Sequence, residues 1–486
     1  MRPEDTHGVG DPDPEEAEAA LRRADALGVG GPELADRLDA AGSAYRRRFW
    51  DAGDLQDLHK AVGHYRRAAR ADPARRAVWT NETAVALTDL YDLTGDLGDL
   101  AAAREAAEEA TDAAEEGSPQ WARCAATLVL CLWNRYDATG ALGDLEAAIE
   151  VGTRALGALP RTDAAWARVC SNVGMLHMDR YERLREDDDL QASVRLSREA
   201  VDAALEDDPE LGGWWNNLGN ALLTRFGAQF PDRALPRPGE HVDLTDVDAA
   251  VAAYETALRI SRWKFAGRPT FLVNLGNARV DRAEALRLAG RREEAVAALR
   301  EAVVPLTEAV SLTSRTAPYR ASRLNVLGEA RRALADETGA ADEIDTARAA
   351  FREACGTGLD IAPEMTVGAA DNWIRWATRR AAWEEVGEAD GYLLRAARAL
   401  HEAQAVRRHR EAWLVASHGL AHEGAYALAR LGRAEAAAVR LERGRAVLLS
   451  EELALVPALL DRLPRHFQDR YTAAVRRVQE ALRDGG

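Results

Sequence analysis

Residues 121–160 indicate the fold most directly: WARCAATLVLCLWNRYDATG, followed by ALGDLEAAIEVGTRALGALP. In the first half, apolar residues recur at steps of three and four, as on one face of an α-helix, and Gly140 is a typical helix stop. In the second half Asp144 is the predicted N-cap, and Pro160 closes the unit. The stretch therefore predicts two antiparallel helices joined by a short turn.

The same unit repeats along the chain. Tyr91, Tyr136, Tyr181 and Phe226 lie 45 residues apart, and an Asp-Leu pair follows eight or nine residues after each tyrosine. A period of this size is typical of stacked helix pairs, each of which contacts its neighbours. We therefore predict an all-α, right-handed solenoid of about nine antiparallel helix pairs over residues 32–456.

Three segments depart from this period. Residues 1–31 are acidic and rich in Gly and Pro, and we expect a flexible N-terminal segment. Residues 227–244 contain several prolines, which predicts an inserted loop. The motif NLGN returns after it with a step of 57, because residues 217–220 match residues 274–277. Residues 457–486 are expected to form a helical tail or linker.

Composition excludes several classes of partner. The chain has 63 basic and 80 acidic residues, which gives a formal net charge of −17 and a pI of about 5.2. Such a field repels phosphate backbones and anionic lipid, so we expect neither nucleic acid nor membrane as a partner. The four cysteines form no CxxC pair and no signal peptide precedes the repeats, so we expect buried thiols and a cytoplasmic protein.

Three segments carry a family resemblance. WWNNLGNAL (residues 214–222) and FLVNLGNARV (residues 271–280) resemble the first helix of a tetratricopeptide repeat, and LARLGRAEAAAVRLERGRA (residues 428–446) resembles its turn and second helix. Glycine within a helix costs about 1 kcal/mol relative to alanine. We therefore expect Gly219 and Gly276 to permit a close approach of two helices.

A longer pattern is more specific. The repeated RY, TG, L and DL elements, followed by LERGRAVLLSEELA (residues 441–454), resemble the N-terminal helical region of actinobacterial CHAT proteins. The resemblance implies coupling to a caspase-like cysteine peptidase domain. Only 32 residues follow Ala454, and none is a cysteine. A Cys–His nucleophile pair cannot form there, so we expect no enzyme and no cofactor. The chain is then either the repeat region of a longer protein or a stand-alone relative.

Two groups of polar residues were weighed as sites. His418 and His422 lie one helical turn apart, but the metalloprotease motif needs Glu where Gly419 stands, and we expect no metal site. One arginine per unit ends the first helix, and this column has two interpretations. It is a ladder for an acidic partner, or it pairs with the helix C-terminus and the adjoining aspartate. Its members are Arg135, Arg180, Arg225 and Arg282.

The resemblance also implies a ligand-binding site in a groove. In tetratricopeptide repeats that bind peptide C-termini, asparagine at the positions of Asn220 and Asn277 contacts the ligand, although a structural role is the alternative. Asn217 and Asn274 are expected to hydrogen-bond across the repeat junction. Adjacent residues of a helix face different directions, so Trp215 is expected to be exposed if Trp214 is in the core.

These observations predict a protein-interaction module. We expect a regulatory or sensor region of a CHAT-type peptidase system that binds a peptide or protein in a groove lined by the first helices. The peptidase domain itself is a candidate partner, in cis or in trans. The alternative is a helical scaffold region of a bacterial transcriptional or signalling regulator.

Overall fold

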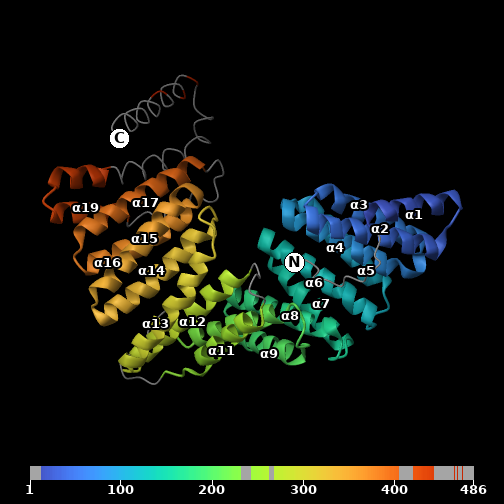
Figure 1. Ribbon diagram of the computed structural model, residues 1–486, viewed down its shortest axis with the longest axis horizontal. Coiled ribbons are helices and arrows are strands. Elements are labelled where there is room, and N and C mark those ends of the chain that lie inside the picture. Colours follow the sequence, from blue (N-terminus) through green and yellow to red (C-terminus); the bar gives the residue numbers. More distant parts are fainter. Residues whose placement is uncertain are drawn as a thin grey trace. The chain divides into compact units, whose positions relative to one another are not determined.

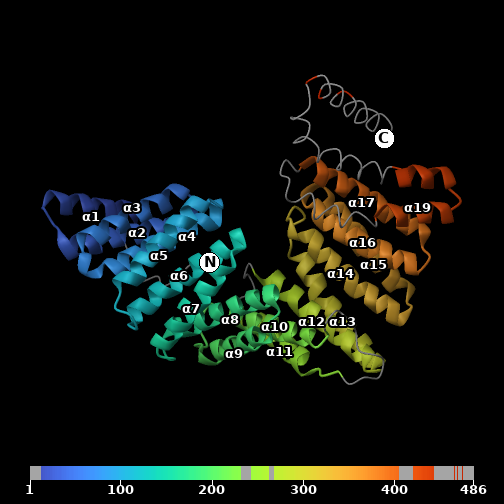
Figure 2. The same ribbon diagram turned by 180° about the vertical axis from the view of Figure 1, so that it is seen from behind.

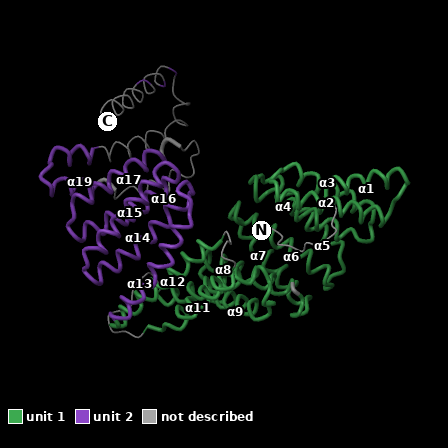
Figure 3. The backbone as a smooth tube through the Cα atoms, in the orientation of Figure 1, with its two compact units in different colours: residues 1–291 green, residues 292–486 purple. Residues whose placement is uncertain are grey.

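The structure is a computed structural model that describes residues 13–230, 242–261, 267–403 and 420–442, together with residues 465, 468 and 473. Within these residues the regular elements are all helices (Figure 1). The chain divides into two compact units, residues 1–291 and residues 292–486 (Figure 3). This confirms the predicted all-α fold of stacked helix pairs.

Unit 1 consists of two rows of helices that alternate along the chain (Figures 1 and 2). After α1 (Pro14–Ala26), the first helices form an inner row, in which neighbouring members contact one another. The inner row is α2 (Gly31–Ala52), α4 (Arg76–Thr94), α6 (Pro119–Thr139), α8 (Ala164–Leu184), α10 (Leu211–Ala228) and α12 (Arg268–Leu288). The outer row is α3 (Leu55–Ala71), α5 (Leu97–Ala113), α7 (Leu142–Ala158), α9 (Asp187–Ala203) and α11 (Thr245–Ile260).

Unit 2 repeats the same arrangement. Two helix pairs form its centre, α14 (Tyr319–Thr338) with α15 (Ala341–Ile361) and α16 (Pro363–Arg379) with α17 (Trp383–Ala403). Helix α13 (Arg292–Ser311) packs on α14, and α19 (Leu420–Arg430) packs on α17. Together the two units hold seven complete pairs in the described residues. Helices α12 and α13 lie in different units and are not counted as a pair, and the rest of the predicted nine involves residues 404–419 and 443–456, which lie outside the described residues.

Glycine ends several inner helices, as predicted for Gly140. Gly95, Gly140 and Gly339 have φ angles of 69°, 70° and 67°, a left-handed conformation that glycine adopts without strain. The Gly140 amide donates to the Tyr136 carbonyl at 2.7 Å and closes the last turn. The predicted N-cap of the next helix is wrong, because Ala141 occupies the cap position and Asp144 is the third residue of α7.

Glycine also sets how closely the paired helices approach. A Cβ added to Gly219 would lie 2.6 Å from the ring of Tyr254 on the facing helix, which confirms the predicted close approach. Gly328 faces Phe351 in the same way, at 2.9 Å. In the α6–α7 pair the glycine lies on the outer helix: a Cβ added to Gly152 would lie 2.5 Å from Val173 of α8 and 3.4 Å from Val129 of α6.

Part of the predicted flexible segment is helical. Residues 14–26 form α1, whose first turn is capped by Asp13, and Ala17 and Leu21 are buried in the cluster formed with α2. The rest of that segment up to residue 12 lies outside the described residues. So do residues 231–241 of the predicted insertion and nearly all of the predicted tail.

The core is built mainly from alanine and leucine, and in unit 1 a tryptophan recurs in successive helix pairs. Trp79, Trp121, Trp166 and Trp214 are all buried, as expected for residues that fill the junctions between units. The four cysteines are buried free thiols, as predicted. No helix among the described residues is long and apolar enough to cross a membrane.

Candidate functional site

Arginines of the predicted column join the two helices of a helix pair. Near the end of α8, Nε and Nη2 of Arg180 lie 2.9 and 2.6 Å from the carboxylate of Asp189, in the first turn of α9. This two-bond geometry, which we name the Arg–Asp clamp, matches the planar guanidinium to the carboxylate. The same clamp is formed by Arg135 with Asp144 at 2.7 Å and by Arg225 with Asp246 at 2.7 Å.

In the clamp of Arg180 and Asp189 the carboxylate is buried and ionised. Asp189 is 2% exposed and also interacts with Nδ1 of His177 at 2.7 Å. Burial alone would raise the pKa of Asp189, but the hydrogen bonds from Arg180 and His177 outweigh it and lower the pKa. An external acid would have to displace this internal partner. We therefore infer that the arginine column holds helices together, which was the structural alternative for these residues.

Of two further arginines, Arg282 departs from the clamp pattern and Arg48 follows it. Arg282 pairs with Asp248 of the preceding outer helix at 2.5 Å, because the position nine residues after it is Arg291 and not an aspartate. Arg48 and Asp57 form a clamp at 2.7 Å that the sequence reasoning missed. Their separation of nine residues equals that of Arg180 and Asp189, and this spacing is the signal that identifies it.

The two predicted asparagines line one hollow on the inner row. Asn220 of α10 and Asn277 of α12 are both partly buried, and the hollow has a volume of about 240 Å³. Its wall is completed by Met175, Met178, Asp179 and Glu182 of α8, Leu223 and Thr224 of α10, Tyr254 of α11 and Asn274 of α12. Three consecutive inner helices therefore contribute to one surface, and the structure brings the predicted pair together.

The two asparagines differ in their internal contacts. Oδ1 of Asn220 accepts the hydroxyl of Tyr254 at 2.7 Å and the amide of Asn274 at 3.4 Å. Asn277 makes no hydrogen bond within the described residues, so its amide is available to a ligand. The predicted junction bonds are confirmed, since Asn274 donates to Asn216 at 2.9 Å and Asn217 donates to Ser171 at 3.1 Å.

Trp215 lies away from this hollow. Trp214 is buried, and Trp215 is half-buried because its ring packs against the same apolar cluster. The tryptophan is not among the residues that line this hollow. We therefore place the candidate site at the asparagines and their neighbours.

A second hollow of about 430 Å³ continues the surface toward the N-terminus of unit 1. It shares Asp179 and Glu182 with the first hollow and adds Tyr136, Asp137 and Gly140 of α6 together with Arg183 of α8. The shared residues make one continuous groove over α6, α8, α10 and α12, which we name the inner groove.

The inner groove is acidic. Oδ2 of Asp179 accepts the indole N–H of Trp133 at 2.7 Å. Burial raises the pKa of Asp179 to about 6, although the Trp133 hydrogen bond opposes it, and the nearby carboxylates of Asp137 and Glu182 raise it further. Arg183 is the one cation among the residues that line the two hollows. The groove thus concentrates negative charge at its centre.

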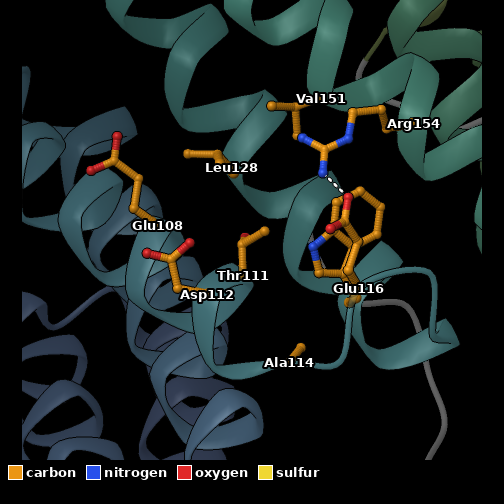
Figure 4. A pocket seen from close by; sticks show the side chains of 9 residues that line it. Glu108, Thr111, Asp112, Ala114, Glu116, Leu128, Val151 and Arg154 are labelled. Atoms are coloured by element: carbon orange, nitrogen blue, oxygen red, sulfur yellow. Dashed lines mark hydrogen bonds and ion pairs between the residues drawn. The ribbon is translucent and has the colours of Figure 1, made fainter.

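A third hollow, of about 500 Å³, lies among α5, α6 and α7 (Figure 4). Figure 4 shows Glu108, Thr111 and Asp112 on one wall and Arg154 on the other, where it forms an ion pair with Glu116. The guanidinium of Arg154 also lies 5.1 Å from the ring centre of Trp121. Its cation is therefore already satisfied within the chain, and none of the predicted site residues lines this hollow.

The described residues contain no cluster of three or more His, Cys, Asp or Glu side chains placed to bind a metal ion. His422 is exposed, and His418 lies outside the described residues. The cysteine thiols are not activated, because burial raises the pKa of Cys131 to about 11 and that of Cys170 to about 12.

The fold defines the chain as an all-helical protein built from stacked, antiparallel helix pairs. No protein-family model and no curated protein matches the sequence. Among solved structures, BtubC (BKLC) from P. vanneervenii is similar at 19% identity with a TM-score of 0.37, over 54% of this chain and 92% of that chain. A dimer of human IFIT1 with PPP-AAAA is similar at 12% identity with a TM-score of 0.39, over 89% of this chain and 79% of that chain.

Proposed function

We propose that the chain is a protein-interaction module that binds a segment of a partner protein in the inner groove. The observation that carries this proposal is the wall shared by three consecutive inner helices, with Asn220 and Asn277 facing one hollow. Side-chain amides both donate and accept hydrogen bonds, so they suit the peptide groups of a bound main chain. The repeats then act as a rigid support for this surface.

We further propose that this binding regulates a CHAT-type cysteine peptidase, present as a following domain or as a separate chain. The support is the sequence resemblance of the repeats and of residues 441–454 to the helical regions of such proteins. In this view the chain carries no catalytic residues and binds no cofactor. Partner binding in the groove changes what the peptidase domain can contact.

A display selection tests the binding function without assuming a partner. A library of random 16-residue peptides is selected on the immobilised full chain and on an Asn277→Ala variant. Asn277 is the better probe because its amide has no hydrogen-bond partner in the described residues, whereas Asn220 supports Tyr254. We expect peptides that bind the wild-type chain and bind the variant less tightly, at an unchanged melting temperature. Failure to enrich any peptide above an empty matrix would refute the proposed function.

A further inference from the structure

The inner groove has a regular chemical pattern that follows the repeat. Residues four apart lie on the same face of a helix, and the repeat places equivalent residues side by side on successive inner helices. One column begins apolar and continues as amides: Val85, Leu130, Met175, Asn220 and Asn277. A second column, one turn further along each helix, holds Asp89, Asn134, Asp179, Thr224 and Asp281. The third holds Asp92, Asp137, Glu182, Gly227 and Glu284.

The register of these columns is supported by contacts between helices. The amide of Asn134 on α6 donates to Asp92 on α4 at 3.3 Å. The indole of Trp133 on α6 reaches Asp179 on α8. Asp179 and Glu182 line both hollows of the inner groove. The columns are therefore neighbours in space, and their side chains form one surface.

Three carboxylates of this surface lack an ion-pair partner, whereas Glu284 of the third column pairs with Arg287. In the described part of unit 1, neither Asp137 nor Asp179 nor Glu182 forms an ion pair with an arginine or a lysine. Asp89, in contrast, is held by Arg46 at 2.7 Å. Arg183 lines the same groove, but no ion pair joins it to these three carboxylates in the described residues. The clamp arginines are occupied by their own aspartates.

We propose that the inner groove binds an extended basic segment, with Lys or Arg at about every third residue and apolar residues among them. This inference rests on the proposed function and names the partner's chemistry. Neighbouring packed helices lie about 8–10 Å apart, and an extended chain advances about 3.3 Å per residue. Cations three residues apart therefore reach the carboxylates of successive inner helices, Asp137 and Glu182 first.

The remaining columns complete the fit. Leu130, which is partly exposed, and Met175 offer apolar contact to side chains between the cations. Asn277 is placed to hydrogen-bond the main chain of the same segment. Opposite charge along a groove steers association and fixes the register of the bound segment. An extended acidic segment would meet repulsion from the same surface.

The test uses a fluorescent 16-residue peptide with Arg at every third position and Leu or Ser between. Two comparison peptides replace Arg with Glu or with Gln. Binding to the full chain is followed by fluorescence anisotropy at two salt concentrations. We expect the Arg peptide alone to bind, and to bind more weakly at high salt.

Two triple variants with the same change in net charge locate the site. The inner variant is Asp137→Asn, Asp179→Asn and Glu182→Gln. The outer variant is Glu105→Gln, Glu150→Gln and Asp202→Asn, three exposed residues of the outer row. We expect the inner variant to lose about tenfold or more in affinity and the outer variant to change less than about twofold.

Equal losses in both variants would overturn the inference, because they would show attraction to net charge alone. Equal binding of the Gln peptide would also overturn it. These outcomes differ from failure of the proposed function. If the display selection yields peptides that depend on Asn277 but carry no excess of Lys and Arg, the groove binds protein and the basic partner is wrong.

Discussion

The packing of Gly219 against Tyr254 allows a quantitative test of how the helix pairs fit. A Cβ at residue 219 would lie 2.6 Å from Tyr254 Cε1, whereas ordinary contacts begin at 3.4 Å. The ring is fully buried and its hydroxyl is bound by Asn220, so it cannot move aside freely. We expect Gly219→Val to destabilise the protein by about 3 kcal/mol, at the upper end of overpacked cores.

Replacing Tyr254 with glycine leaves a cavity between the two helices. Removing a buried aromatic side chain costs about 3–5 kcal/mol, and glycine within a helix adds about 1 kcal/mol, so Tyr254→Gly should cost about 5 kcal/mol. In the α6–α7 pair a glycine already lies on the outer helix, where a Cβ added to Gly152 would be 3.4 Å from the side chain of Val129. The double variant Gly219→Val with Tyr254→Gly should therefore be more stable than the sum of the single changes by about 2 kcal/mol.

Urea unfolding followed by circular dichroism and by tryptophan fluorescence measures the cycle. The two probes must give coincident transitions, since long repeat arrays can lose two-state behaviour. Gly213→Val is the matched control, because it lies in the same helix and an added Cβ there meets nothing within 4 Å. If the losses in unfolding free energy of the two single variants add up to that of the double variant, close approach does not determine this packing. The same conclusion follows if Gly213→Val and Gly219→Val destabilise the protein equally.

Two further substitutions and one chemical modification test the electrostatics and the core. Asp189→Asn should cost about 3 kcal/mol relative to an Asp188→Asn control, because it breaks a buried ion pair. The folded-state pKa of Asp189 is lowered, so this contribution is present above about pH 4 and is lost as the pH falls through the folded value. For Asp179 the folded-state pKa is raised to about 6, so the folded state favours the protonated carboxyl. The stability that this group contributes at low pH is therefore lost as the pH rises through about 6. Asp179→Asn should therefore raise the melting temperature at pH 7.5 and leave it unchanged at pH 3. Ellman's reagent should modify none of the four cysteines in the native protein at pH 7.5 and all of them in denaturant, because each thiol is buried.

The sequence predicts those features that the repeat imposes locally. Gly140 ends its helix and Gly219 permits close packing, because each position requires a conformation or a space that only glycine supplies. The N-cap at Asp144 was wrong because the carboxylate has a stronger partner in Arg135. Helix α1 was missed because its apolar face is short and is completed only by packing on α2.

The candidate site was predictable in part. The resemblance to tetratricopeptide repeats placed Asn220 and Asn277 on one surface, and the structure brings them to one hollow. The carboxylates of the groove follow the same 45-residue step as the tyrosines, from Asp92 to Asp137 to Glu182. Their function is not visible in that step, because it depends on which aspartates have an arginine within reach, and this is a property of the packed helices.

The repeat uses one residue type for two opposite purposes. Asp189 lies beside Arg180, and its pKa is lowered, so its charge stabilises the fold. Asp179 lies ten residues earlier in the same unit without a cation, and its pKa is raised, so its charge at neutral pH destabilises the fold. No arginine or lysine forms an ion pair with Asp179 in the described residues, and a local arrangement that costs stability without a structural gain supports the proposal of a functional surface. This supports the proposal that a partner supplies the cations that pair with the carboxylates of the inner groove.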